Sequence, residues 1–199
     1  MTIAWTQHRF SGGVLALNVT NTVVHRDDPA LSFDRFEEAG EIARFAEAAN
    51  VYCADELGGR SLSVSRPDAA AEKIIALREA TDRLFRHVAD KGTLQTDNLS
   101  DFMLVVGKAL EGHGGAVSPD RPFGNPEKPL PFEAGVSFSA LSLLQPDRLR
   151  RIRVCRNCAW LFLDRSRNAS RLWCDMAVCG NRQKAKRHYR RRRAERGDG

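Results

Sequence analysis

Hydrophobic and polar positions recur along much of the chain with the period of an amphipathic helix. The clearest helix is predicted over residues 67–90, where large apolar side chains lie three or four positions apart and a Lys-Gly pair ends the pattern. The same spacing predicts helices over residues 34–51 and 96–110. The body of the protein is therefore expected to be mostly helical.

Other segments carry weaker patterns. Residues 12–24 begin with a glycine pair and are rich in β-branched side chains, which predicts a strand or a strand running into a short helix. Residues 111–131 are rich in Gly and Pro and predict a loop or short hairpin. Residues 132–144 fit both a strand and a helix, and their pattern leaves the two open. These segments predict an α+β fold in which β structure is the minor part.

Charge divides the chain into two parts of opposite sign. Residues 146–199 hold 17 Lys and Arg against 5 Asp and Glu, a net charge of +12. Because the whole chain carries +6, residues 1–145 carry −6. We therefore predict a mostly helical domain of regulatory or sensor type over 1–145 and a small basic module over 146–199. Such asymmetry is typical of a body joined to a polyanion-binding end.

Composition narrows the class of protein. The chain has 199 residues, of which 42% are hydrophobic and 28% charged, as in soluble globular proteins. Its longest apolar run, residues 102–106, is far shorter than the ~20 residues that a membrane span needs. The first residues have no basic segment followed by an apolar one, so no export signal is expected. We expect a cytoplasmic protein with reduced or metal-bound cysteines.

Residues 1–145, the acidic part of the chain, contain few candidate functional residues. Its histidines are scattered and no nucleophile lies near a base in the pattern, so no enzyme is expected. Polar residues Asn18, Asn21 and Thr22 interrupt an apolar run. They either line a pocket for a small molecule or make local turn and capping hydrogen bonds.

Four cysteines in the basic part have the spacing of a structural zinc site. Cys155 and Cys158 form a C-x2-C pair, and Cys174 and Cys179 follow after fifteen residues. The alternative is a pair of disulfides, which the expected reducing compartment disfavours. Four thiolates fill the coordination shell of one Zn²⁺ and leave no open position for a catalytic water.

The residues around the cysteines predict a small treble-clef-like finger. Residues 160–164 and 171–174 are expected to be two strands joined by a turn over 165–170. Gly180 would let the backbone approach the metal, and Asn181 would cap the helix that follows.

This module resembles the CGNR zinc-finger family of bacterial proteins. The resemblance is carried by WLFLD-x-SRN-x-S-x-x-WC-x-M-x-x-CGNR-x-K, in which Gly180, Asn181 and Arg182 follow Cys179. Near the N-terminus, GGVLALNVTNTVVHR is similar to that family's opening, with Asn18 where Asp is usual. The resemblance implies an N-terminal α/β domain of a stress-induced transcription regulator and a DNA-binding finger with one structural zinc ion.

The residues after the last cysteine predict the partner. A helix over about 181–194 would carry basic side chains all round, and phosphates would relieve their mutual repulsion. The first residues of that helix could read base edges in a major groove, while arginines of the finger turn could contact phosphates. The predicted nucleic-acid contacts are Asn181, Arg182, Gln183, Lys184, Lys186, Arg187, Arg190, Arg191, Arg165, Arg167 and Arg171.

The main hypothesis is a zinc-dependent DNA-binding transcription regulator, associated with the nucleoid when bound. An RNA- or ribosome-associated module is one alternative, since arginine-rich segments bind RNA readily. A thiol redox sensor that releases zinc on oxidation is another. Useful sequence specificity would need a homodimer. The effector, if one exists, stays open.

Overall fold

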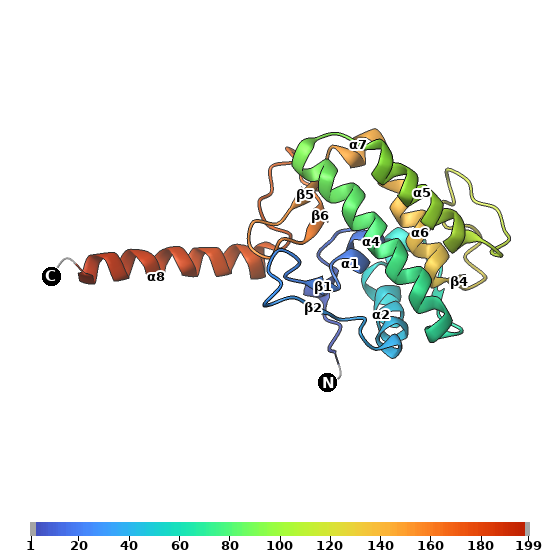
Figure 1. The fold of residues 1–199 in the computed structure, drawn as a ribbon, viewed down its shortest axis with the longest axis horizontal. Coiled ribbons are helices and arrows are strands. Elements are labelled where there is room, and N and C mark those ends of the chain that lie inside the picture. The colour runs from blue at the N-terminus through green and yellow to red at the C-terminus, as the bar shows by residue number, and fades with distance from the viewer. Residues whose placement is uncertain (1–2, 198–199) are drawn as a thin grey trace.

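The computed structural model in Figure 1 consists of a helical body, a β-hairpin packed against it, and one long helix that projects away from both. The structure describes residues 3–197. The elements are η1 (Gln7–Phe10), α1 (Leu15–Thr20), β1 (Val23–Val24), β2 (Phe33–Asp34), α2 (Ala39–Tyr52), α3 (Ala54–Leu57), β3 (Leu62–Ser63), α4 (Pro67–Lys91), α5 (Thr96–Leu110), β4 (Leu130–Pro131), α6 (Phe132–Ser142), α7 (Pro146–Leu149), β5 (Ile152–Val154), β6 (Leu161–Leu163), η2 (Met176–Gly180) and α8 (Asn181–Gly197).

Helix α4 is the centre of the body. It packs against α1, α2, α5 and α6 and also reaches the hairpin strand β5 (Figure 1). The predicted helices over 67–90 and 96–110 are confirmed as α4 and α5, and Gly92 ends α4 in the left-handed conformation that glycine favours. The predicted helix over 34–51 begins later, at Ala39, because Asp34 pairs with Val23 across β1 and β2.

Tertiary contacts decide the secondary structure of two segments whose sequence patterns were weak. The segment 12–24, expected to begin as a strand, forms helix α1 through most of its apolar run. Its first amide, on Leu15, donates to the Glu56 carboxylate at 2.6 Å, which satisfies a group that the helix itself leaves unpaired. The ambiguous segment 132–144 forms helix α6, which packs against α1 and is buried on most sides.

The hairpin strand β6 is buried on both of its faces. Strands β5 and β6 pair antiparallel, with Ile152 opposite Leu163. Because side chains alternate across a strand, Leu161 and Leu163 face the main core of the body, whereas Phe162 packs with the cysteines and Trp160 in a second, smaller core. One strand of three residues therefore belongs to two cores.

The body also binds the backbone of β6. The Leu163 amide donates to the Gly12 carbonyl at 2.9 Å, and Asn21 exchanges two hydrogen bonds with the amide and carbonyl of Leu161 at 3.0 and 2.8 Å. The glycine pair allows this approach. Gly13 has φ of +83°, and a Cβ added there would lie 3.3 Å from the Leu163 carbonyl oxygen.

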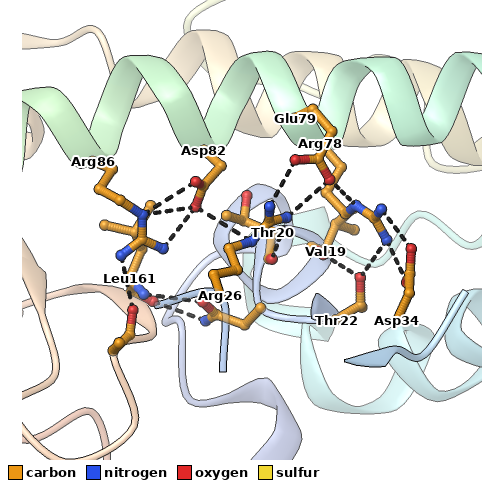
Figure 2. A network of polar contacts seen from close by, with 12 residues as sticks. Val19, Thr20, Thr22, Arg26, Asp34, Arg78, Glu79, Asp82, Arg86 and Leu161 are labelled. Atoms are coloured by element: carbon orange, nitrogen blue, oxygen red, sulfur yellow. Dashed lines mark hydrogen bonds and ion pairs between the residues drawn. The ribbon is translucent and has the colours of Figure 1, made fainter. Parts of the chain in front are cut away.

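A buried arginine on α4 ties the first strand pair to the body. Arg78, only 3% exposed, donates to both carboxylate oxygens of Asp34 at 2.7 Å and to the hydroxyl of Thr22 at 3.2 Å (Figure 2). A planar guanidinium matches a carboxylate in this two-bond geometry, which gives direction as well as strength.

The same polar network continues along α4 to the hairpin. Arg26 pairs with Glu79 at 2.7 Å, Asp82 pairs with Arg86 at 2.7 Å, and Arg86 donates to the Ala159 carbonyl at 2.9 Å (Figure 2). Ala159 lies between Cys158 and Trp160, so the network ends inside the cysteine turn. Among residues 3–197, no helix is both long enough and apolar enough to cross a membrane.

We predict that Arg78→Met lowers the free energy of unfolding by about 2–4 kcal/mol, because it leaves Asp34 and Thr22 without their buried donor. Arg83→Met is the matched control, since Arg83 is an exposed arginine of the same helix and should change stability by less than about 0.5 kcal/mol. Urea denaturation of both variants measures the difference. Equal stabilities would contradict a structural role for the network.

Low pH should remove the stabilisation that the ion pair between Arg78 and Asp34 provides. Burial acts to raise the pKa of Asp34, but hydrogen bonds from Arg78 and the Phe36 amide outweigh it and lower that pKa below its ordinary value. A carboxyl with a lowered folded-state pKa stabilises fully above the unfolded pKa of about 3.9 and loses that effect as pH falls through the lower folded value. The stability gap between wild type and Arg78→Met should therefore shrink below about pH 4 in a pH series of urea melts.

Candidate metal centre and basic helix

The first cysteine pair lies in a tight turn at the end of the hairpin. Cys155 follows β5, and its amide donates to the Trp160 carbonyl at 2.8 Å. The Ala159 amide donates back to the Cys155 carbonyl at 2.9 Å, and Ala159 takes a positive φ of 58°. These bonds fold the C-x2-C turn so that both thiols point to the same side.

The second pair is brought in by the loop and η2. Cys174 precedes η2, and Cys179 lies within it. All four Sγ atoms lie within 4.8 Å of one another, with 3.7 Å between Cys158 and Cys174 and between Cys174 and Cys179. Zn–S bonds of about 2.3 Å in a tetrahedron place the sulfurs about 3.8 Å apart. The four cysteines therefore fit one zinc ion.

The cysteines affect one another's ionisation. Hydrogen bonds from Cys158 and Cys174 lower the pKa of the Cys155 thiol, and their bonds to Cys155 raise the pKa of Cys158 and Cys174. The thiolate is the form that binds metal, so zinc binding has to release the protons of these two thiols. The side-chain amide of Asn157 donates to the Cys179 sulfur at 3.4 Å. Cys155, Cys174 and Cys179 are buried among Trp160 and Phe162, and no disulfide joins them.

The predicted strand over 171–174 is wrong. The partner of β6 is the upstream strand β5, and the 165–173 segment is an irregular loop. The buried carboxylate of Asp164 organises this loop, accepting from the amides of Ser166 at 2.9 Å and Arg171 at 2.8 Å. The signal for this role was weak, since an Asp at the end of an apolar strand is common in turns.

The capping residue before the basic helix also differs from the predicted one. Asp175, directly after Cys174, accepts from the amides of Ala177 and Val178 at 2.8 and 3.2 Å and so caps η2. Asn181, expected to be the cap, instead donates its side-chain amide to the Ala177 carbonyl at 2.9 Å. An Asp just before a helical turn is a recognisable capping signal that the sequence reasoning passed over.

Gly180 lies against Met176 of η2. A Cβ added there would lie 2.6 Å from the Met176 sulfur, and the expected approach of the Gly180 backbone to the metal stays a prediction. On the other side of Asp175, His8 of η1 bonds its carboxylate at 3.0 Å and stacks on Trp160 at 5.6 Å. The first residues of the chain thus hold the second cysteine pair in place.

The predicted nucleic-acid contacts fall into two groups. Most of the basic side chains of α8 are exposed and make no side-chain bond to the rest of residues 3–194. This group contains Arg182, Lys184, Lys186, Arg187, Arg190 and Arg191. Arg167, in the finger loop, is exposed in the same way.

The second group is bonded to the fold. Gln183 donates to Asn157 at 2.9 Å, which itself contacts Cys179, so the start of α8 is linked to the metal centre. Arg171 donates to the Cys174 carbonyl at 2.6 Å, and Arg165 donates to the Gly13 carbonyl at 2.6 Å. Their positions in the sequence did not separate them from the free basic residues.

The three polar residues proposed as a ligand pocket are buried and bonded internally. Asn18 accepts from the Gly12 amide at 2.8 Å and donates to the buried Cys53 sulfur at 3.4 Å. Thr22 donates to the Val19 carbonyl at 2.7 Å, and Asn21 binds β6 as described above. The local hydrogen-bonding interpretation therefore holds for Asn18 and Thr22, and Asn21 joins the body to the finger.

Together, the hairpin, the cysteine turn and η2 define a small zinc-binding module attached to a helical body. Residues 151–192 match the CGNR zinc finger family. This part of the chain is a CGNR zinc finger whose four clustered cysteines can bind one zinc ion. No curated protein matches the chain. The resemblance of residues 1–145 to a stress-induced regulator domain stays a prediction.

We predict that the purified protein holds one zinc ion per chain and that Cys158→Ser weakens zinc binding by more than about 100-fold, since even residues that only support zinc ligands cost 10–100-fold. Cys53→Ser is the matched control. Cys53 lies in the body core, burial raises its pKa to about 12, and Ser keeps an acceptor for Asn18. Metal analysis and chelator competition measure both. Zinc loss in Cys53→Ser alone would contradict the four-cysteine site.

Proposed function

We propose that the protein is a zinc-dependent DNA-binding protein that regulates transcription, with α8 and the finger loop as its DNA-binding surface. The observation that carries the proposal is the isolation of α8. Figure 1 supports it, since the helix extends away from the body and its packing contacts are with η2. Helices with no apolar face are unusual unless a partner covers them.

Charge identifies the kind of partner. Eight exposed Lys and Arg side chains follow Asn181 on α8, and none of them forms an ion pair with a carboxylate of residues 3–194. Tyr189, which is 68% exposed, is the only large apolar side chain among residues 181–194, so this part of α8 has no apolar stripe for packing on a protein. Such a surface favours a polyanion, because phosphates replace the repulsion between neighbouring cations with attraction.

Geometry favours duplex DNA over structured RNA. A helix of 17 residues is about 26 Å long at 1.5 Å per residue, and the B-DNA major groove, about 12 Å wide, admits one. The major groove of A-form RNA is too narrow for side chains to read. The bonds from Gln183 to Asn157 and from Asn157 to Cys179 would hold the helix start at a set angle once zinc is bound.

The remaining parts of the proposal follow from the finger. Four thiolates leave zinc no open position, so we propose a binding role and no catalysis. One helix reads few base pairs, and we propose that specific recognition uses two copies of the chain on a two-part site.

We predict that a fluorescent duplex binds the zinc-loaded protein with a slope of log affinity against log salt of about −5, as about six phosphate contacts require. The triple variant Lys186→Gln, Arg187→Gln, Arg190→Gln should lower the affinity at least tenfold and make the slope shallower by about 3. Fluorescence anisotropy at several salt concentrations measures both quantities.

The matched control neutralises three exposed basic residues of α4 and α5, namely Arg83→Gln, Lys91→Gln and Lys108→Gln. It has the same net charge as the α8 variant and should keep the wild-type slope. Equal salt-dependence slopes for the two triple variants would contradict the proposal that α8 binds DNA. Structured RNA that displaces the duplex at equal concentration would move the protein to the RNA-binding class.

A further inference from the structure

A cavity of about 660 Å³ lies where the finger loop meets the body. Its finger side is formed by Arg165, Ser166 and Arg167, and its body side by α7, the end of α6 and the long loop before β4. Loops of such length without regular structure are uncommon in compact domains unless they have a function. Arg165 and Arg167 are also predicted nucleic-acid contacts, whereas the other residues of the lining are not.

Four arginines line the cavity without a carboxylate partner. Arg148, Arg151 and Arg165 each use one terminal nitrogen, bonding the Ser142 hydroxyl at 2.8 Å, the Ser166 carbonyl at 2.8 Å and the Gly13 carbonyl at 2.6 Å. Arg167 makes no side-chain bond within residues 3–194. None of the four lies within ion-pair distance of a carboxylate in that range, which leaves most of their N–H donors free for an anion.

The acidic residues of the lining bond groups other than these arginines. Asp147 pairs at 3.0 Å with Arg150, which is not a residue of the lining. Both carboxylate oxygens of Glu56 are engaged, by the Ser139 hydroxyl and the Leu15 amide at 2.6 Å. Burial raises the pKa of Glu56, while the charges of Arg165 and Arg148, which lie beyond ion-pair distance, act to lower it. Asp55 is exposed at the rim.

Part of the lining is apolar. Phe123 is buried there and packs edge-to-face on Phe138 at 6.4 Å, and Pro119, Pro122 and Leu163 complete the wall. Small-molecule sites combine an apolar wall with a few charged groups that orient the ligand. A bare inorganic anion would leave this wall uncovered, and an uncharged apolar molecule would leave the arginines unpaired.

We infer that this cavity is a binding site for a small carboxylate with an apolar, ring-sized body. The carboxylate lies among Arg148, Arg151 and Arg167, and the ring lies on Phe123 and the prolines. A DNA phosphate is the less suitable occupant, because a phosphate backbone carries no apolar group to cover Phe123. Since Arg165 and Arg167 follow Asp164, which holds the finger loop, a bound ligand contacts both the body and the finger.

The test measures the binding of three small molecules to the full-length, zinc-loaded protein by two-dimensional NMR. Benzoate carries both the ring and the charge, benzyl alcohol only the ring, and acetate only the charge. We expect saturable benzoate binding with a Kd on the order of 1 mM or below, and at least about tenfold weaker binding of the other two. The amides of Phe123 and Ser166 should shift.

The double variant Arg148→Gln, Arg167→Gln should weaken benzoate binding by about tenfold or more, whereas Arg83→Gln, an exposed arginine outside the cavity, should bind within twofold of wild type. Zinc content and Tm check that the double variant is folded, and the three-probe comparison on wild type stands without it.

Several results would overturn the inference. They are no saturation by benzoate up to about 10 mM, benzyl alcohol binding as tightly as benzoate, or unchanged benzoate affinity in the folded double variant. A double variant that loses affinity for duplex DNA but not for benzoate would assign these arginines to phosphate contacts instead. A failure of DNA binding by the wild type would leave the benzoate result unaffected.

Discussion

The outer edge of β6 presents backbone groups that its hairpin partner cannot bond, and the body supplies their partners. Asn21 binds the amide and carbonyl of Leu161, and the Gly12 carbonyl accepts from the Leu163 amide. Buried backbone groups left unpaired are costly, so this contact places the hairpin firmly on α1. With the hairpin placed, Leu161 and Leu163 complete the body core, and Phe162 faces the cysteines. The finger is therefore continuous with the body and not a module on a loose linker.

Zinc coordination and the body hold the finger from opposite sides. A zinc ion on the four cysteines would join the C-x2-C turn to η2, while Arg86 bonds the Ala159 carbonyl in the first turn and His8 bonds Asp175 beside the second pair. Metal binding in small modules contributes folding free energy, and these contacts extend that coupling to α4 and η1. The direction of α8 follows from the same parts, since it continues η2 without a break.

Arginines serve three different purposes in this chain. Arg78 is a buried structural ion-pair partner, and Arg171 and Arg151 bond carbonyls of the finger. Those of α8 are exposed and without partners within the described side chains, which supports their assignment to a polyanion. Around the cavity beside Phe123, three arginines both bond the fold and keep N–H donors free for a ligand. Arg148, Arg151 and Arg165 each bond the fold through one terminal nitrogen. The net charge does not distinguish these roles, because it counts every guanidinium equally.

The amino-acid sequence by itself determined the long helices, the zinc site and the basic character of α8. Helical period, cysteine spacing and local charge act over short stretches of chain, so they can be read without knowing the fold. Tertiary structure decided the rest. It made residues 15–20 a helix because Glu56 binds the Leu15 amide, and it paired β6 with the upstream strand β5 instead of residues 171–174. It also turned Asn21 from a candidate ligand contact into the residue that binds the finger. The contacts of Leu15 and Asn21 depend on partners far along the chain, and the identity of those partners is a property of the packed structure and not of any local pattern.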